Sequence, residues 1–98
     1  MAYYDDDTIR IDAVCRDHAG STMNLTGATV TCVAQATAQP AISGLVTITG
    51  AEVGEVECVF GAGTFVGKHG GYTLYVQVTK TGTLTTASVT TFTVLQTP

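Results

Sequence analysis

Strict alternation of apolar and polar residues is the feature of this chain that most limits how it can fold. The clearest case is the segment Tyr-Thr-Leu-Tyr-Val-Gln-Val-Thr from Tyr72 to Thr79. Successive side chains of a β-strand point to opposite faces, so this segment is predicted to be a strand with Tyr72 and Leu74 on a buried face. Tyr75 falls on the other face and is expected to be exposed.

Segments of the same kind recur at regular spacing, over residues 8–16, 28–35, 45–49, 55–60 and 85–95. Turn-forming residues separate them, including Lys80-Thr-Gly-Thr83, which is typical of a β-hairpin turn. Residues 36–44 are small and polar and are expected to form a long connection, for which a crossing from one sheet to the other is one of the routes open. Parity within 45–49 places Val46 and Ile48 inward.

The last of these segments changes phase along its length. Ala87 and Val89 fall on one parity. Phe92 and Val94 fall on the other. A β-bulge near Thr90 would reconcile the two halves, because a bulge inserts one extra residue into a strand.

This pattern predicts an all-β protein with an immunoglobulin-like antiparallel β-sandwich of six to seven strands. A small closed barrel is the alternative architecture. The residues assigned to one shared core are Val30, Val56, Phe60, Leu74 and Val76. The length of 98 residues fits one domain, with residues 8–98 forming the sandwich and residues 1–7 an N-terminal arm.

Low charge limits the partners of the chain. Charged residues make up 12% of the sequence, and the net charge is −4. The few basic residues do not cluster, which argues against a nucleic-acid partner, and no apolar run is long enough to span a membrane. A surface poor in charge suits a subunit that packs against other chains, although a threonine-rich exposed sheet would look the same.

Neither catalysis nor cofactor or metal binding is expected. The three cysteines, Cys15, Cys32 and Cys58, are odd in number and lie in apolar phase, so they are predicted to be buried reduced thiols. The run Asp5–Asp7 lacks the loop and distal glutamate of a calcium site, and reads as a solvated acidic segment. His18 and His69 fall in predicted loops, away from any poised nucleophile.

Two segments are candidates for contact with other proteins. In residues 1–7, Tyr3 and Tyr4 are either part of a frayed terminus or an arm that docks on a neighbour. The glycine-rich segment 61–71 is expected to be mobile and to present Phe65 and Val66. Tyr75 is the third candidate. Tyr72 has a different role: it is placed to tie a corner of the sandwich through its hydroxyl, or else is a plain core residue.

Three segments together resemble a known family of domains. They are the strand, turn and strand from Ile9 to Val30 with Leu25-Thr-Gly-Ala-Thr-Val30, the hairpin from Val46 to Phe60, and Gly71-Tyr-Thr-Leu-Tyr-Val-Gln-Val-Thr79. Their order and spacing are similar to the immunoglobulin-like sandwich of tailed bacteriophages. That sandwich occurs at the N-terminus of baseplate upper proteins and as small stand-alone head or tail structural proteins. The glycine-rich segment 61–71 and the low charge depart from the family pattern.

The resemblance implies a virion structural protein made in the host cytoplasm. It would pack onto other virion proteins in the tail, the baseplate or the head, where small β-domains serve as decoration or cement proteins, as part of a symmetric assembly. The alternative function is a module that binds glycans or a cell surface. The segment Met1–Asp7 has neither the basic nor the apolar region of a signal peptide, which is in keeping with cytoplasmic synthesis.

Overall fold

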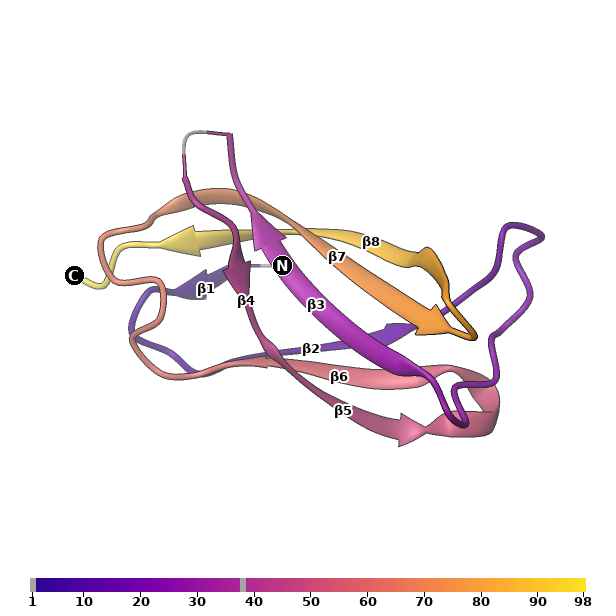
Figure 1. The fold of residues 1–98 in the computed structure, drawn as a ribbon. Helices are drawn as coiled ribbons and strands as arrows, with labels where there is room; N and C mark the ends of the chain where they lie inside the picture. Colours follow the sequence, from indigo (N-terminus) through magenta and orange to yellow (C-terminus); the bar gives the residue numbers. More distant parts are fainter. Residues whose placement is uncertain (1, 38) are drawn as a thin grey trace.

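The structure, a computed structural model, describes residues 2–37 and 39–98 and consists of two β-sheets packed face to face (Figure 1). The larger sheet has the strand order β1-β8-β7-β3-β4, and the smaller sheet has the order β2-β6-β5. The elements are β1 Ala2–Tyr4, β2 Ile9–Val14, β3 Thr29–Gln35, β4 Ile42–Ser43, β5 Leu45–Gly50, the 3-10 helix η1 Ala51–Val53, β6 Glu55–Phe60, β7 Gly70–Lys80 and β8 Thr83–Leu95.

The order of the strands is that of an immunoglobulin sandwich. In that fold the strands B, E and D lie in one sheet and C, F and G in the other. Here β2, β6 and β5 occupy the first set of positions, and β3, β7 and β8 the second. The predicted fold class is therefore confirmed, with eight strands in place of six to seven. The additional strands β1 and β4 are three and two residues long, too short for periodicity to reveal.

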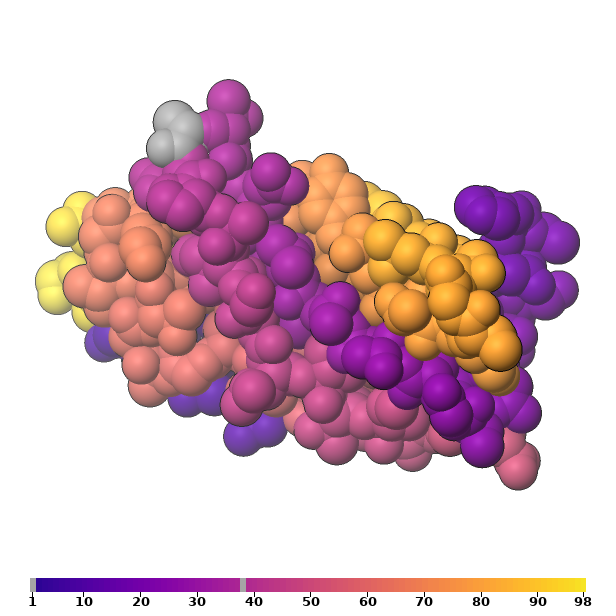
Figure 2. All heavy atoms as spheres, in the orientation of Figure 1, coloured from indigo at the N-terminus to yellow at the C-terminus, as the bar shows by residue number. Residues whose placement is uncertain are grey.

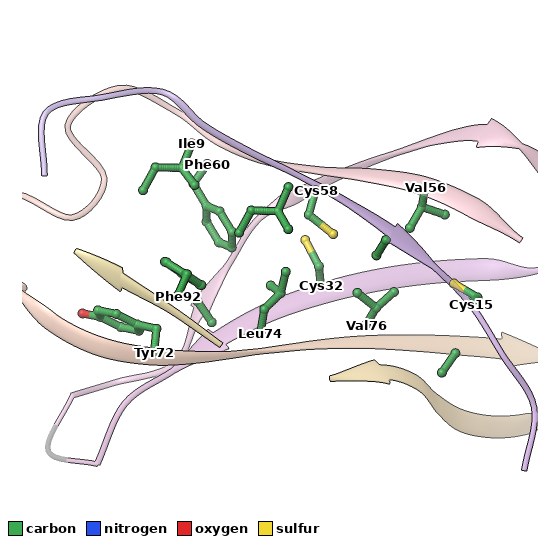
Figure 3. Close-up of a cluster of buried hydrophobic side chains, with 14 of the residues drawn as sticks. Ile9, Cys15, Cys32, Val56, Cys58, Phe60, Tyr72, Leu74, Val76 and Phe92 are labelled. Carbon is green, nitrogen blue, oxygen red and sulfur yellow. The ribbon is translucent and has the colours of Figure 1, made fainter. Parts of the chain in front are cut away.

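The core lies between the sheets and is built from the predicted alternation. In β2 the buried residues are Ile9, Ile11 and Ala13, and β7 buries every second residue from Tyr72 to Val78. Phe60, Tyr72 and Phe92 gather toward one end of the core, as Figure 3 shows. Of the predicted core set, Val30 is only half-buried, whereas Val56, Phe60, Leu74 and Val76 are fully buried.

The bulge that was predicted for the last strand is present, but at a different residue. The bulge in β8 lies at Ala87 rather than near Thr90, because Val76 pairs with Ser88 while the next residue of β7 pairs with Thr86. The carbonyl oxygen of Ala87 accepts a 3.0 Å hydrogen bond from the backbone N–H of Arg16, which ties the bulge to the end of β2. Val89, beyond the bulge, is exposed.

Ile48 lies on the inward side of β5, as predicted, because it pairs with buried Val56 of β6, although its position on an edge strand leaves it 40% exposed. The register of β5 against β6 shifts between Ile48 and Gly50. A shift of this kind bends an edge strand, and here it follows Ile48, near the end of β5. Val46, which precedes the shift, is packed against the core as predicted.

Residues 2–4 are not a free arm. They form β1, which pairs in parallel with Thr93–Leu95 of β8. The ring of Tyr3 packs edge-on against Phe92, with the ring centroids 6.1 Å apart. The chain is held beyond β1 by the backbone N–H of Asp5, which donates to the carbonyl oxygen of Leu95 at 2.9 Å. The prediction of a separate N-terminal arm is corrected: this segment is an edge strand of its own domain.

The connections between strands gather at the two ends of the sandwich (Figure 1). At one end the segment between β2 and β3 meets η1, where buried Leu25 donates its backbone N–H to Ala51 at 2.7 Å. The β7–β8 hairpin turns through Thr81 and Gly82, both with positive φ, as predicted for a two-residue turn. The predicted connection 36–44 does cross between the sheets, with β4 in one and β5 in the other; its residue 38 lies outside the described residues.

Candidate interaction surface

The outer face of the larger sheet carries no charged residue among those that the structure describes. Side chains on this face are the ones that alternate with the buried residues of each strand. They belong to Ala2, Tyr4, Thr29, Thr31, Val33, Gln35, Ser43, Thr73, Tyr75, Gln77, Thr79, Leu84, Thr86, Val89, Thr91, Thr93 and Leu95. We call this surface the uncharged face. Atoms of β3 and β7 border one another on the molecular surface in Figure 2 (purple and orange).

The outer face of the smaller sheet has the opposite character. It carries Arg10 and Asp12 on β2, and Glu55 and Glu57 on β6. Arg10 forms an ion pair with Glu57 on the neighbouring strand, with an N–O distance of 3.2 Å. Apart from Lys80 at the end of β7, whose Nζ donates to the carbonyl oxygen of Asn24, the charged residues of the described strands lie on this side of the sandwich, and the other side presents hydroxyl, amide and apolar groups.

A row of larger side chains crosses the middle of the uncharged face. Tyr75 pairs with Val33 on one side and with Val89 on the other, so the three side chains lie next to one another across three strands. Val89 is 59% exposed, whereas Val33 and Tyr75 are half-buried. A shallow hollow of about 290 Å³ opens beside Tyr75 and is lined by Val33, Gln35, Tyr75, Gln77 and Thr86.

The structure separates the five predicted contact residues into two groups. Tyr4, Val66 and Tyr75 reach the surface, and Tyr4 and Tyr75 share the uncharged face. Tyr3 is half-buried against the core, and Phe65 is completely buried. Phe65 therefore has no surface to offer a partner, and its assignment as a contact residue is corrected. Its ring fills the space between Phe60, Tyr72 and Phe92.

Tyr72 ties a corner of the sandwich, which is one of the two roles that the sequence left open for it. It lies near the start of β7, and its hydroxyl donates a 2.7 Å hydrogen bond to the carbonyl oxygen of Lys68. A tyrosine at this position in an immunoglobulin-like domain bonds to the backbone a few residues upstream in the same way. Burial raises the pKa of the Tyr72 phenol, so the hydroxyl remains a donor. The bond fixes the last residues of the glycine-rich segment.

Replacing Tyr72 with phenylalanine is expected to destabilise the domain by about 1–3 kcal/mol, because the part-buried hydrogen bond to the carbonyl oxygen of Lys68 is lost. Urea unfolding followed by circular dichroism measures this loss. The matched control is Tyr75→Phe, because Tyr75 is also a strand tyrosine but has a surface position; its effect should stay within about 0.5 kcal/mol. Equal losses in the two variants would contradict a special role for the Tyr72 hydroxyl.

A polar cluster that the sequence did not reveal joins the two ends of the chain. The Asp5 carboxylate accepts hydrogen bonds from the hydroxyl of Thr97 at 2.7 Å and from its backbone N–H at 3.2 Å. Nε2 of His69 lies 3.0 Å from the other carboxylate oxygen. These contacts hold the pKa of Asp5 below its ordinary value, and the hydrogen bond from the Thr97 hydroxyl makes the largest contribution. Asp5 is thus a buried structural residue rather than part of a solvated acidic segment.

The depressed pKa of Asp5 makes stability depend on pH. The ionised form is favoured in the folded state, so its contribution is present above the ordinary pKa of 3.8 and is lost as pH falls below it. The melting temperature of the wild type should therefore fall more between about pH 6 and pH 3 than that of Asp5→Asn. Asp6→Asn is the control, because Asp6 is exposed and its carboxylate accepts a hydrogen bond, among the described residues, only from the Thr97 hydroxyl, which also bonds to Asp5. Identical pH profiles for the wild type and Asp5→Asn would contradict the assignment.

The remaining candidates for chemistry do not come together in space. Over residues 2–37 and 39–98, no three His, Cys, Asp or Glu side chains are grouped so that they could hold a metal ion. The exposed residue His18 lies in the loop after β2, and His69 pairs with Asp5. No described helix is long and apolar enough to cross a membrane. Searches against family models and against curated proteins found no match for this chain.

Proposed function

We propose that this chain is a non-enzymatic structural subunit that packs onto other proteins through its uncharged face, and that it does so in a bacteriophage particle. The observation that carries the contact role is the uncharged face itself. A single domain in water is normally kept soluble by mixed charges over its whole surface. This chain has a net charge of −4, but the residues that the structure describes leave the outer face of one sheet without charge.

The composition of this face fits a protein contact. The cores of protein interfaces are depleted in charged residues and enriched in aromatic ones, and their centres carry most of the binding energy. Tyr75 sits at the middle of the row that Val33 and Val89 complete. Burying these side chains against a partner would remove apolar surface from water without leaving an unpaired charge.

The virion setting is supported by the resemblance of the sequence to phage sandwich domains. The three segments that carry the resemblance correspond to the strands from β2 to β3, the β5–β6 hairpin, and β7. The proposed location is a tail, a baseplate or the head surface, where the domain would act in assembly or decoration. Mass spectrometry of sedimented, purified particles tests this setting, and absence of the chain from them would overturn it.

The contact surface itself is tested by Val89→Lys. A lysine at the centre of the uncharged face would have to be buried without a counter-charge, so incorporation into particles should fall by at least about tenfold. Thr47→Lys is the control, because Thr47 is also exposed on a strand but lies on the charged outer face of the smaller sheet, paired with Glu57. Wild-type incorporation of Val89→Lys would show that the partner binds elsewhere.

Glycan binding is the second candidate, and the hollow beside Tyr75 favours it. Sugar rings stack on aromatic faces, and the amides of Gln35 and Gln77 line the same hollow as the tyrosine. A glycan array probed with the purified domain tests this function directly. Binding to a defined glycan that is lost in Tyr75→Ala would favour it over protein packing.

A further inference from the structure

Cys32 and Cys58 face each other across the interior of the sandwich. Cys32 belongs to β3 of the larger sheet, and Cys58 belongs to β6 of the smaller sheet. Figure 3 shows the two sulfur atoms pointing toward one another between the sheets. Both side chains are buried free thiols, with 1% and 0% exposure. We propose that these two cysteines are a latent disulfide site, which an oxidant converts into a covalent link between the sheets.

The backbone near the two thiols lets the sheets come close. The chain crosses from one sheet to the other at Gly44, and Cα atoms of β3 and β5 approach within 8 Å there. A side chain at Gly44 would place its Cβ only 2.8 Å from Sγ of Cys32, so the glycine lets the backbone pass close to the sulfur. Disulfides require a short distance between the two Cβ atoms. Figure 3 shows the sulfurs of Cys32 and Cys58 turned toward one another in this part of the interior, which is the orientation that a link between them needs.

Access to Cys32 passes through a weakly held part of the sheet. Its thiol lies 4.0 Å from the carbonyl oxygen of Leu45, directly after the crossing. The neighbouring strand β4 has only two residues, and it pairs with Val33 and Ala34. Short edge elements open locally at low free-energy cost. A small oxidant can therefore reach Cys32 without global unfolding.

The two thiols differ in pKa, and this difference decides which of them reacts with the oxidant first. The neighbouring Cys58 thiol lowers the pKa of Cys32, whereas the Cys32 thiol and burial raise the pKa of Cys58. With hydrogen peroxide as the oxidant, the Cys32 thiolate attacks one peroxide oxygen, the O–O bond breaks, hydroxide leaves and takes up a proton to become water, and Cys32 becomes a sulfenic acid. The Cys58 sulfur then attacks the Cys32 sulfur and water leaves. Two thiols are oxidised, and hydrogen peroxide is reduced to two waters.

The site does not depend on the proposed function and is tested on the isolated protein. The native chain is treated with hydrogen peroxide, denatured in an alkylating reagent and analysed by mass spectrometry. The expected product has lost two hydrogen atoms, contains a Cys32–Cys58 linked peptide and carries one alkyl group, on Cys15. Its melting temperature should exceed that of the reduced protein by at least about 5 °C, because the link closes a long loop. A reductant should reverse both changes.

Matched variants separate this site from general oxidation. Cys15→Ser should oxidise like the wild type. Cys58→Ser should form no disulfide and should leave a sulfenic acid at Cys32 that dimedone traps. If Cys58→Ser fails to fold, the peptide map of the wild type decides alone. Three alkylated cysteines after peroxide treatment, sulfinic acid accumulating at Cys32, or a link that includes Cys15 would each overturn the proposal.

Discussion

Phe65→Ala is expected to lower the free energy of unfolding by about 3–5 kcal/mol, the usual cost of truncating a buried aromatic side chain. Phe65 is 0% exposed, although it lies in a glycine-rich connection rather than in a strand. Its ring centroid is 5.2 Å from that of Phe60, 5.0 Å from that of Tyr72 and 5.9 Å from that of Phe92, in edge-to-face arrangements. Alanine would remove all three contacts and leave a cavity at the end of the core.

Urea unfolding of the purified variant measures this effect, with Val66→Ala as the matched control. Val66 is the next residue along the chain and is 58% exposed, so its truncation should change stability by no more than about 0.5 kcal/mol. A loss below about 1 kcal/mol in Phe65→Ala would mean that the segment can leave the core without harm. In that case the segment would be the mobile contact loop that its glycines suggest.

The burial of Phe65 could not be predicted from alternation in the sequence. Alternation located the buried faces of β2, β6 and β7 because each strand repeats its signal over several residues. Phe65 stands alone among glycines and turn residues, and a single aromatic residue does not form a repeating pattern that would indicate its burial. The Tyr72 corner was predictable because its place at the head of a strand is itself a pattern.

The cluster around Asp5 was missed for a different reason. Its partners His69 and Thr97 lie 64 and 92 residues away along the chain. Local composition made residues 5–7 look like a solvated acidic run, since no sequence window contains all three groups. The parallel pairing of β1 with β8 brings Asp5 to Thr97. Because β1 has only three residues, its sequence shows no alternation from which the strand could be predicted.

The candidate surface was predictable in part. Tyr75 was placed on the exposed side of β7 from parity alone, and it lies there. That this side joins the outward residues of β3 and β8 into one face without charge follows from the order of the strands, which alternation does not specify. The contact residues expected in loops were therefore partly wrong, whereas the residue expected on a strand was placed correctly.

Gly54→Ala is expected to destabilise the domain by about 2–5 kcal/mol. Gly54 has φ of +75°, which costs a residue with a Cβ about 1–2 kcal/mol. Its backbone also lies where the end of β2 meets the segment before β3, and a Cβ there would stand 2.7 Å from the carbonyl oxygen of Cys15 and 2.9 Å from that of Met23. Both atoms are backbone, and the Cys15 carbonyl is fixed by the N–H of Met23, so neither can move aside cheaply.

Gly27→Ala separates the two causes, because Gly27 has nearly the same φ, +76°, but nothing lies within 4 Å of the Cβ that alanine would add. It should lose only the conformational part, about 1–2 kcal/mol. The difference between the two variants in the free energy of unfolding, measured with urea, gives the steric cost of the close backbone contacts at Gly54. Equal losses would mean that the β2–β3 connection moves aside, and that the backbone contacts at Gly54 do not hold it in place.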